Sequence, residues 1–311
     1  MVGYEYGGPV DCNVELDLTS LRGKTAIVTG GAKGLGQAYA LALVNAGSTV
    51  IIADLDKSAG QSFAAQHSSQ LYFVHCNVLI WEDQVRLFAE AARLSPSGKI
   101  HHVIANAGIF KADEVYSYSE QLSEPNLITT DVNVKGTLFT TKLAMHYFIK
   151  QNGTTPSLSQ EDTSLVIISS GAGIYDCIRM PEYCASKWAV RGIMHGLRRT
   201  AHFYGSRVNM ISPYYVETTV LPKKVYEYIR GKGIDFATLE DAGQCLLRLL
   251  SDPAINGHSL FIAPRKWAPR GYMDLDLEDT EGTALLKEIQ IEQMISEPVD
   301  SGLFPEVRLY M

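Results

Sequence analysis

The chain has 311 residues, of which 46% are hydrophobic and 20% charged, and its 27 basic and 34 acidic residues leave a formal net charge of −7. This composition excludes a disordered or collagen-like chain. The negative charge argues against a nucleic-acid-binding protein, which needs a basic surface to meet the phosphates.

The sequence also predicts a cytoplasmic protein without a membrane span. It contains no run of about 18 apolar residues, and the initial segment MVGYEYGGPVDCNVELD lacks the basic start and apolar core of a secretory signal. The five cysteines are scattered and form no CxxC pair, which is typical of reduced thiols rather than of a disulfide framework or a zinc site. We therefore expect no metal centre.

From Lys24 onward, short apolar runs alternate with longer helical patterns. The runs predict buried strands at Thr25–Thr29, Thr49–Ala53, Leu71–Cys76, His101–Ala105, Leu165–Ser169, Val208–Ile211 and Ser259–Ile262. Helices are predicted over Gln37–Ala46, Ser58–Gln66, Glu82–Leu94, Glu124–Gln151, Glu182–Tyr204 and Leu239–Leu250. Wholly apolar strands separated by helices indicate an α/β fold with a single doubly wound parallel sheet, the Rossmann fold.

The rest of the chain lies outside this alternation. Residues 153–163 are a polar loop, and the tail contains one plausible amphipathic helix at Ala284–Ile295. Because the tail is too short for a core of its own, we predict one domain over residues 23–263, an N-terminal arm over residues 1–22 and a C-terminal extension over residues 264–311.

A glycine-rich segment, Thr29-Gly30-Gly31-Ala32-Lys33-Gly34-Leu35-Gly36, joins the first predicted strand to the first predicted helix. Glycines there allow a sharp turn and let a pyrophosphate approach the N–H groups of the helix N-terminus. A glycine cluster alone fits a plain tight turn equally well. Its position after a buried strand in a βαβ unit favours dinucleotide binding.

An acidic residue, Asp54, follows the second predicted strand, 18 residues after Gly36. A carboxylate there can accept both ribose hydroxyls of an adenosine and would repel a 2′-phosphate, so we expect NAD, with NADP less favoured. A helix-capping aspartate is the alternative interpretation. Lys33 favours NADP instead, because a cation beside the loop could pair with a 2′-phosphate. Against NADP, the residue that follows Asp54 is Leu55 rather than an arginine.

These motifs resemble those of the short-chain dehydrogenase/reductase family over about residues 20–263. TGGAKGLG is similar to the TGxxxGxG signature, and Asn106-Ala107-Gly108 resembles the NAG motif. Asn133, Ser170 and Tyr183-x-x-x-Lys187 match the catalytic tetrad. Within the family, the sequence is similar to NAD-linked 15-hydroxyprostaglandin dehydrogenases and related alcohol dehydrogenases.

The resemblance implies hydride transfer between the cofactor and an alcohol or ketone, with Tyr183 as general acid/base. Tyr183 and Lys187 lie one helical turn apart on one face. The lysine ammonium, together with the positive charge of an oxidised nicotinamide, favours the phenolate form of the tyrosine. Lys187 is also implied to hydrogen-bond the nicotinamide ribose.

The other two residues of the tetrad, Ser170 and Asn133, each have an alternative interpretation. Ser170 is implied to hold the reacting oxygen; Ser169 is its competitor, set aside because the family spacing to Tyr183 is thirteen residues. Asn133 is implied to hold a proton relay to Lys187 through backbone and water. The alternative for Asn133 is an exposed polar residue of a helix.

The resemblance also implies which residues hold the cofactor. They are Gly30, Lys33, Gly34, Leu35, Gly36, Asp54, Leu55, Asn77, Val78, Asn106, Ala107, Gly108, Tyr183, Lys187, Pro213, Val216 and Thr218. Two positions depart from the family pattern. Asn77 replaces an aspartate, but its side-chain carbonyl can still meet the adenine amino group, and Tyr214 replaces the glycine that follows Pro213.

The implied substrate pocket is apolar and aromatic. Its expected lining comprises Ile109, Phe110, Ile174, Tyr175, Ile178, Met180, Tyr214, Tyr215, Tyr226 and Tyr228. Such a lining suits a bulky hydrophobic secondary alcohol or ketone. Arg179 could pair with a substrate carboxylate, although a solvated loop arginine is the simpler interpretation. Tail residues around Trp267 could cover the pocket or a subunit boundary.

The family is commonly dimeric or tetrameric, so we expect a homodimer or homotetramer in which the predicted helices Glu124–Gln151 and Glu182–Tyr204 pair across a two-fold axis. The alternatives to an NAD-dependent dehydrogenase are an NADPH-dependent ketone reductase and a non-catalytic dinucleotide-binding protein. A cofactor-bound cyclase or isomerase is a third possibility.

Overall fold

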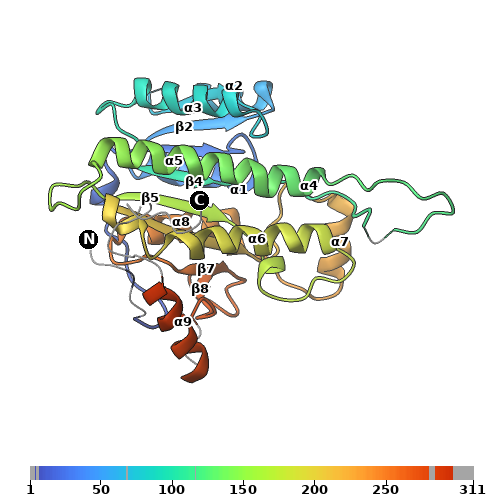
Figure 1. The fold of residues 1–311 in the computed structure, drawn as a ribbon. Helices are drawn as coiled ribbons and strands as arrows, with labels where there is room; N and C mark the ends of the chain where they lie inside the picture. The colour runs from blue at the N-terminus through green and yellow to red at the C-terminus, as the bar shows by residue number, and fades with distance from the viewer. Residues whose placement is uncertain (1–3, 5–6, 68, 116, 280–283, 297–311) are drawn as a thin grey trace.

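The computed structural model describes residues 4, 7–67, 69–115, 117–279 and 284–296. Within these residues, one eight-stranded sheet runs through the molecule in the order β3-β2-β1-β4-β5-β6-β7-β8 (Figure 1). The strands are β1 (Thr25–Thr29), β2 (Thr49–Asp54), β3 (Leu71–His75), β4 (His102–Ala105), β5 (Thr163–Ile168), β6 (Ser206–Pro213), β7 (Ser259–Ile262) and β8 (Tyr272–Asp274). Neighbouring strands pair in parallel except β7 and β8, which are antiparallel.

Helices cover both faces of the sheet. On one face lie α1 (Gly34–Asn45), α2 (Lys57–Ala65) and α8 (Leu239–Ser251), and on the other lie α3 (Trp81–Leu94), α5 (Thr137–Asn152) and α6 (Pro181–Leu197). Ile51 and Ile52 are both fully buried, but they belong to the cores on opposite sides because successive strand residues face opposite ways. The predicted doubly wound parallel fold is confirmed.

The largest differences between predicted and observed helix bounds occur at two helices. The helix expected from Glu124 begins at Ile128, because Pro125 disfavours helical geometry at the residue before it. It then comprises α4 (Ile128–Thr130), a π-helical turn (Asp131–Gly136) and α5. The helix expected to reach Tyr204 ends at Leu197 and is followed by a separate 3₁₀ turn (Ala201–Tyr204), which stops at Gly205 with a φ of 65°.

Three elements extend the fold beyond the predicted alternation. The helix α7 (Lys223–Gly231) lies between β6 and α8, and β8 adds part of the tail to the sheet. The tail helix α9 (Ala284–Ser296) projects from the body near β8 (Figure 1). The amino-terminal arm lies against the tail, with the Val10 N–H donating to Asp274 Oδ2 at 3.0 Å.

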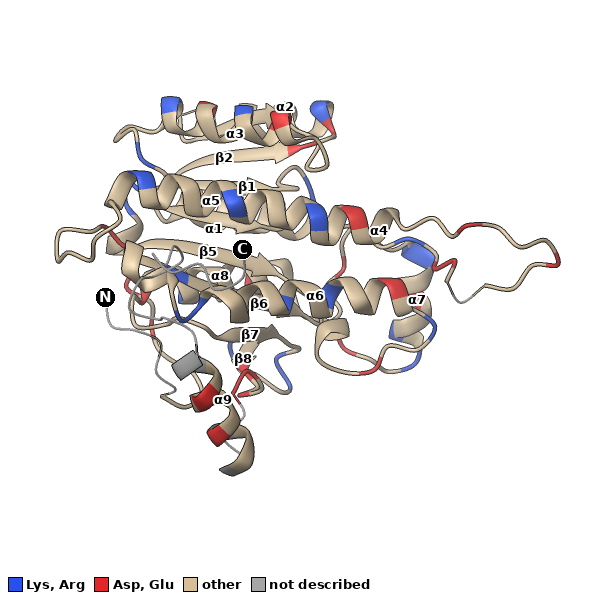
Figure 2. Cartoon of the chain, viewed as in Figure 1, with Lys and Arg blue, Asp and Glu red and all other residues tan. Residues whose placement is uncertain are grey.

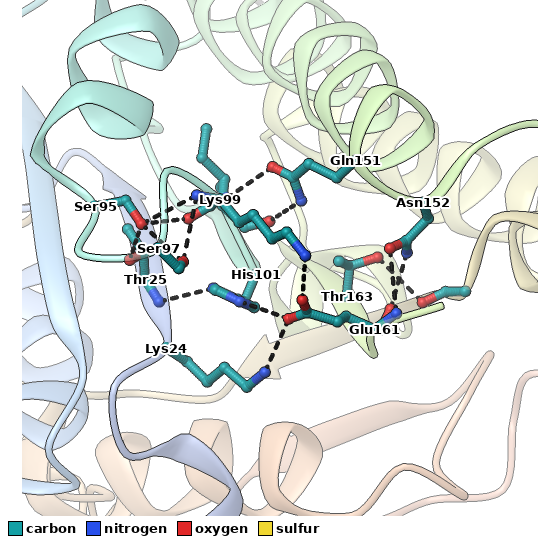
Figure 3. A network of polar contacts seen from close by, with 12 residues as sticks. Lys24, Thr25, Ser95, Ser97, Lys99, His101, Gln151, Asn152, Glu161 and Thr163 are labelled. Carbon is teal, nitrogen blue, oxygen red and sulfur yellow. Dashed lines mark hydrogen bonds and ion pairs between the residues drawn. The ribbon is translucent and has the colours of Figure 1, made fainter. Parts of the chain in front are cut away.

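A polar network joins the amino-terminal ends of three strands, at the opposite ends of the strands from the glycine loop (Figure 3). Glu161 accepts hydrogen bonds from Lys99 and, at 3.1 Å, from Lys24. His101 Nδ1 accepts from the Thr25 N–H at 3.0 Å, which leaves the ring proton on Nε2, 3.0 Å from Glu161 Oε2. The network ties β1, β4 and β5 together.

The strands carry few charged residues, whereas Lys, Arg, Asp and Glu lie on the outer faces of the helices and on the loops (Figure 2). This distribution is typical of a sheet covered on both faces. Within the described part of the chain, no helix has the length and apolarity needed to cross a membrane.

Candidate active site

A cavity of about 680 Å³ lies at the carboxyl ends of the central strands. One end is lined by the glycine loop after β1 and by Asp54 at the end of β2, and the other by residues that follow β5 and β6. Between them, β1 and β4 are adjacent and their connections leave in opposite directions. Ligands of open α/β sheets bind at such a point.

The glycine loop has a geometry that only glycine allows. A β-carbon at Gly36 would lie 2.1 Å from the carbonyl oxygen of Gly30, and Gly34 has a φ of 55°, in the left-handed region. The Asn106 side-chain amide donates to the carbonyls of Thr29 (2.8 Å) and Gly30 (3.0 Å), so this asparagine fixes the loop. Because α1 begins at Gly34, the free N–H groups of its first turn lie at this end of the cavity.

The Asp54 carboxylate is held in place beside the glycine loop. Its Oδ2 accepts from the Ala32 N–H and its Oδ1 from the Asp56 N–H, both at 3.0 Å. Each oxygen retains acceptor capacity for a ribose hydroxyl. Lys33 also lines the cavity, but its Nζ lies 2.5 Å from Asp56 Oδ2, and this hydrogen bond raises the pKa of Lys33.

The remaining predicted cofactor positions line the same cavity: Leu35, Leu55, Asn77, Val78, Ala107, Gly108, Pro213, Val216 and Thr218. The Asn77 side-chain oxygen accepts from the Leu79 N–H at 3.0 Å, so one of its two acceptor directions remains for an adenine amino group. The Thr218 N–H and hydroxyl are each 3.3 Å from Tyr226 Oη. This contact, which sequence reasoning missed, ties α7 to the cofactor end.

Tyr183 and Lys187 lie on α6 at the middle of the cavity. Lys187 Nζ is 5.7 Å from the Tyr183 ring centre and donates to the Ile168 carbonyl at 3.2 Å. Among the described residues this is its single hydrogen-bond partner, so two of its three N–H donors are free. Burial lowers the pKa of Lys187 to about 8. A buried ammonium with two free N–H donors at the cavity wall fits the ribose hydroxyls of a dinucleotide.

The pKa of Tyr183 is raised in the structure. Burial is the main cause, and a hydrogen bond with the Ser170 side chain partly offsets it. This direction is opposite to the lowering that we expected from Lys187 and an oxidised nicotinamide together. In the protein alone, burial therefore favours the protonated phenol.

The two neighbouring serines have different roles in the structure. Ser169 Oγ donates to the Lys187 carbonyl at 3.1 Å, so its hydroxyl is engaged by the backbone of α6. Ser170 Oγ accepts from the Ala172 N–H at 3.2 Å, lines the cavity and reaches Tyr183. Its O–H can therefore donate to a reacting oxygen. The geometry supports the choice of Ser170 made on spacing.

Asn133 is buried within the π-helical turn, not exposed on a helix. Its Oδ1 accepts from the Ile109 N–H at 2.8 Å, and its Nδ2 donates to the Ile109 carbonyl and to Ser186 Oγ, both at 3.0 Å. The Asn133 carbonyl accepts from Thr137 Oγ1 at 2.7 Å. Asn133 thus joins the loop after β4 to α6, and a π-helical turn frequently marks a functional site.

The substrate end of the cavity is mainly aromatic. Of the predicted lining, Ile109, Phe110, Tyr175, Met180, Tyr214, Tyr215 and Tyr226 border the cavity. Ile174, Ile178 and Tyr228 do not, and neither does Arg179, an exposed residue with a φ of 64°. Trp267 packs behind Tyr214, with ring centres 5.4 Å apart.

Several lining residues were missed because α7 was not predicted. Val225 and Ile229 of this helix border the cavity together with Tyr226. Their spacing of one, three and four residues was the available signal for an amphipathic helix. The loop before α7 adds Val220 and Leu221.

Known proteins are similar to this chain over the region that contains the site. A family model described as short chain dehydrogenase matches residues 24–228. The chain is 32% identical to a 5'-hydroxyaverantin dehydrogenase of Dothistroma septosporum over 291 residues, covering 86% of this chain and 92% of that relative. It is 28% identical to the 15-hydroxyprostaglandin dehydrogenase [NAD(+)] of Bos taurus, covering 79% of this chain and 93% of the relative.

Another relative uses a different nicotinamide cofactor. An NADP-dependent dehydrogenase of Cochliobolus lunatus is 30% identical, covering 63% of this chain and 72% of the relative. A crystal structure of a short-chain type dehydrogenase/reductase from Mycobacterium marinum has a TM-score of 0.70 and 23% identity, covering 81% of this chain and 99% of that one, and it bears on the fold alone.

Proposed function

Because the chain belongs to the short-chain dehydrogenase/reductase family of oxidoreductases, we propose that it interconverts a bulky hydrophobic secondary alcohol and its ketone, using NAD and Tyr183 as general acid/base. The observation that carries this proposal is the convergence of Ser170, Tyr183 and Lys187 on one cavity whose far end is the glycine loop and Asp54. The predicted family, and the similarity to 15-hydroxyprostaglandin dehydrogenase within it, are confirmed.

The residues at the cavity's two ends fit a nicotinamide dinucleotide. The N-terminus of α1 suits its diphosphate, and Asp54, Lys187 and Thr218 suit its ribose and carboxamide groups. Bound there, the cofactor supplies the hydride acceptor for oxidation and the hydride donor for reduction. The Asp54 carboxylate supports NAD, since it would repel a 2′-phosphate.

Side chains of the protein transfer the proton of the substrate hydroxyl. In oxidation, Tyr183 Oη takes the proton of the substrate hydroxyl, while the hydrogen on the carbinol carbon leaves with its electron pair and the C–O bond becomes C=O. The Ser170 hydroxyl holds that oxygen in place, and the Lys187 ammonium favours the phenolate. In reduction, Tyr183 returns the proton to the oxygen.

This proposal is tested with the purified full chain, NAD⁺ and a panel of bulky secondary alcohols. We expect absorbance of the reduced nicotinamide to appear, and to be abolished in Tyr183→Phe although that variant still binds the cofactor. Tyr118→Phe, at a loop position that is 90% exposed, is the matched control and should keep full activity. Unchanged turnover in Tyr183→Phe would remove the proposed acid/base.

A second candidate, an NADPH-dependent ketone reductase, is favoured by the position of Lys33 at the cavity rim beside Asp54. A titration with both reduced cofactors separates the two, because tighter NADPH than NADH binding would select the reductase. A non-catalytic dinucleotide-binding protein would bind a cofactor but turn over no alcohol or ketone.

We also propose a homodimer or homotetramer. Leu138 on α5 and Trp188 on α6 are about half exposed, and the two helices run side by side on one face of the molecule (Figure 1). Light scattering on the purified protein gives the oligomeric state. The cytoplasmic location and the reduced state of the thiols stay predictions.

A further inference from the structure

Among the described residues, no charged side chain lines the substrate end of the cavity. Among the described residues that line the cavity, the charged ones are Lys33, Asp54 and Lys187, which belong to the cofactor end and the tetrad. Beyond Tyr183 the walls are apolar or aromatic, and Phe110 meets the Tyr183 ring edge-to-face at 5.1 Å. A carboxylate placed here would lose water without gaining a counter-charge.

Two arginines close in sequence to this end, Arg179 and Arg230, do not line the cavity. Arg179 is exposed and does not line the cavity. Arg230 of α7 pairs with Glu217 at 2.7 Å on the outer surface. Within the part of the chain that the structure describes, no lysine or arginine lines the cavity beyond Tyr183.

Three tyrosines line the same end of the cavity. Tyr175 follows the turn after Ser170, and Tyr214 and Tyr215 follow β6. The ring of Tyr214 contacts both other rings, with ring centres 6.5 Å from Tyr175 and 4.8 Å from Tyr215. None of the three hydroxyls hydrogen-bonds to another described residue. Burial raises the pKa of Tyr175 and Tyr215, so both stay protonated and can donate.

Neighbouring residues contact two of these rings, although Tyr175 is 41% exposed. The Tyr175 hydroxyl lies against Gly171, where a β-carbon would be only 2.1 Å from it. Tyr214 is braced by Trp267, with ring centres 5.4 Å apart, and by Phe261 at 6.0 Å. A preformed aromatic wall binds a flat ring with little loss of conformational entropy.

From these features we propose that the substrate is an uncharged aromatic alcohol or ketone bearing further oxygen substituents. Its rings pack against Tyr214, and its ring oxygens accept hydrogen bonds from the hydroxyls of Tyr175, Tyr214 and Tyr215. The inference rests on the proposed dehydrogenase function and narrows the substrate class of the same site. It excludes alcohols that carry a carboxylate.

Three secondary alcohols of one skeleton test this inference: a naphthyl ethanol, its ring-hydroxylated derivative and its ring-carboxylated derivative. Binding is measured by calorimetry and turnover by absorbance, each with the full chain saturated by the better-bound cofactor. We expect the hydroxylated alcohol to show a Kd and a KM about three- to tenfold lower than the unsubstituted alcohol, as for one or two added hydrogen bonds. The carboxylated alcohol should bind weakest.

Variants that remove single tyrosine hydroxyls show which of them causes the preference for the hydroxylated alcohol. Tyr175→Phe and Tyr214→Phe should raise the KM of the hydroxylated alcohol about three- to tenfold more than they raise the KM of the unsubstituted alcohol. Tyr228→Phe is the control, since Tyr228 is 67% exposed on α7 and does not line the cavity. Thermal midpoints confirm that each variant folds.

The outcomes separate this inference from the proposed function. Turnover without preference for the hydroxylated alcohol, or with preference for the carboxylated one, would overturn the inference and leave the dehydrogenase intact. Binding with the expected preference but no turnover with either cofactor would overturn the dehydrogenase and leave the binding preference. Failure to bind any of the three would overturn the inference.

Discussion

Glu278 of the tail and Arg191 of α6 form an ion pair of 2.7 Å, shielded from solvent. The same Glu278 oxygen lies 2.7 Å from His195 Nε2, one turn further along α6. Arg191 also donates to the Gly173 carbonyl at 3.4 Å, in the turn that begins after Ser170. A line of contacts therefore runs from the C-terminal tail to the proposed active site.

We predict that Glu278→Ala lowers the free energy of unfolding by about 2–3 kcal/mol, because the mostly buried Arg191 would lose its carboxylate partner. The turn at Gly173 should loosen, and kcat should fall with it. Denaturant unfolding and steady-state rates measure the two effects. Glu15→Ala is the control, since Glu15 pairs with Arg270 but is 92% exposed, and its loss should cost less than about 1 kcal/mol. Equal losses in both variants would contradict the assigned role of the tail.

Alanine variants of the adjacent Ser169 and Ser170 test their different roles. Ser170→Ala should reduce kcat about a hundredfold or more, because the donor to the reacting oxygen is removed, while cofactor affinity stays unchanged. Ser169→Ala removes a hydrogen bond to the Lys187 carbonyl and should cost about 1 kcal/mol of stability. A larger loss of kcat in Ser169→Ala than in Ser170→Ala would reverse the assignment.

Cofactor preference should depend on two aspartates in opposite ways. Asp54→Ala removes the proposed ribose acceptor and should weaken NAD⁺ binding about ten- to a hundredfold. Asp56→Ala leaves Asp54 in place but releases Lys33 from its 2.5 Å ion pair, so NADP⁺ binding should tighten. Fluorescence titrations with both dinucleotides give the ratios. If NAD⁺ affinity survives in Asp54→Ala, the carboxylate does not contact the ribose.

The rate of alcohol oxidation should rise with pH and that of ketone reduction should fall. Oxidation needs the Tyr183 phenolate, whose pKa burial raises in the protein alone, whereas reduction needs the phenol. An oxidised cofactor adds a positive charge beside the ring, so the Tyr183 pKa should be lower in the complex. Difference absorbance of tyrosinate, measured with and without NAD⁺, checks the shift. Tyr183→Phe should abolish this signal.

Acid should destabilise the protein through the network at the strand starts (Figure 3). Hydrogen bonds from Lys99 and Lys24 lower the pKa of Glu161 to about 2, so its stabilisation is complete above pH 4.5 and is lost toward pH 2. Burial lowers the pKa of His101, so protonation favours the unfolded chain once the pH falls below about 6.5. Thermal midpoints should therefore begin to fall below that pH.

Glu161→Gln is the variant that separates these two contributions. It removes the carboxylate part of the acid response, so its midpoint should change less between pH 4.5 and pH 2.5 than that of the parent chain. The decline that begins near pH 6.5 should persist, because the buried His101 ring is retained. Parallel curves for the two proteins across the lower range would show that Glu161 contributes nothing there.

The sequence was sufficient where a pattern repeats or a motif has fixed spacing. Continuous apolar runs predicted the parallel strands, and the position of Gly30 to Gly36 after the first of them placed the dinucleotide end of the cavity. Spacing also placed Ser170, Tyr183 and Lys187 at one cavity wall.

Features that depend on tertiary contacts were not predictable. The π-helical turn at Asn133 is stabilised by partners in the loop after β4 and in α6. The three-residue strand β8 exists because the tail returns to pair with β7. The direction of the Tyr183 pKa depends on burial, which residue spacing does not report.

Trp267, half exposed and in edge-to-face contact with Tyr214, gives the protein an intrinsic fluorescent reporter. A ligand that packs against the cavity side of Tyr214 changes the surroundings of that ring and, through it, of the indole. Emission from Trp267 can therefore follow occupancy of the substrate end without any added label. Trp267→Phe would silence this signal and leave the emission of Trp81 and Trp188 as background.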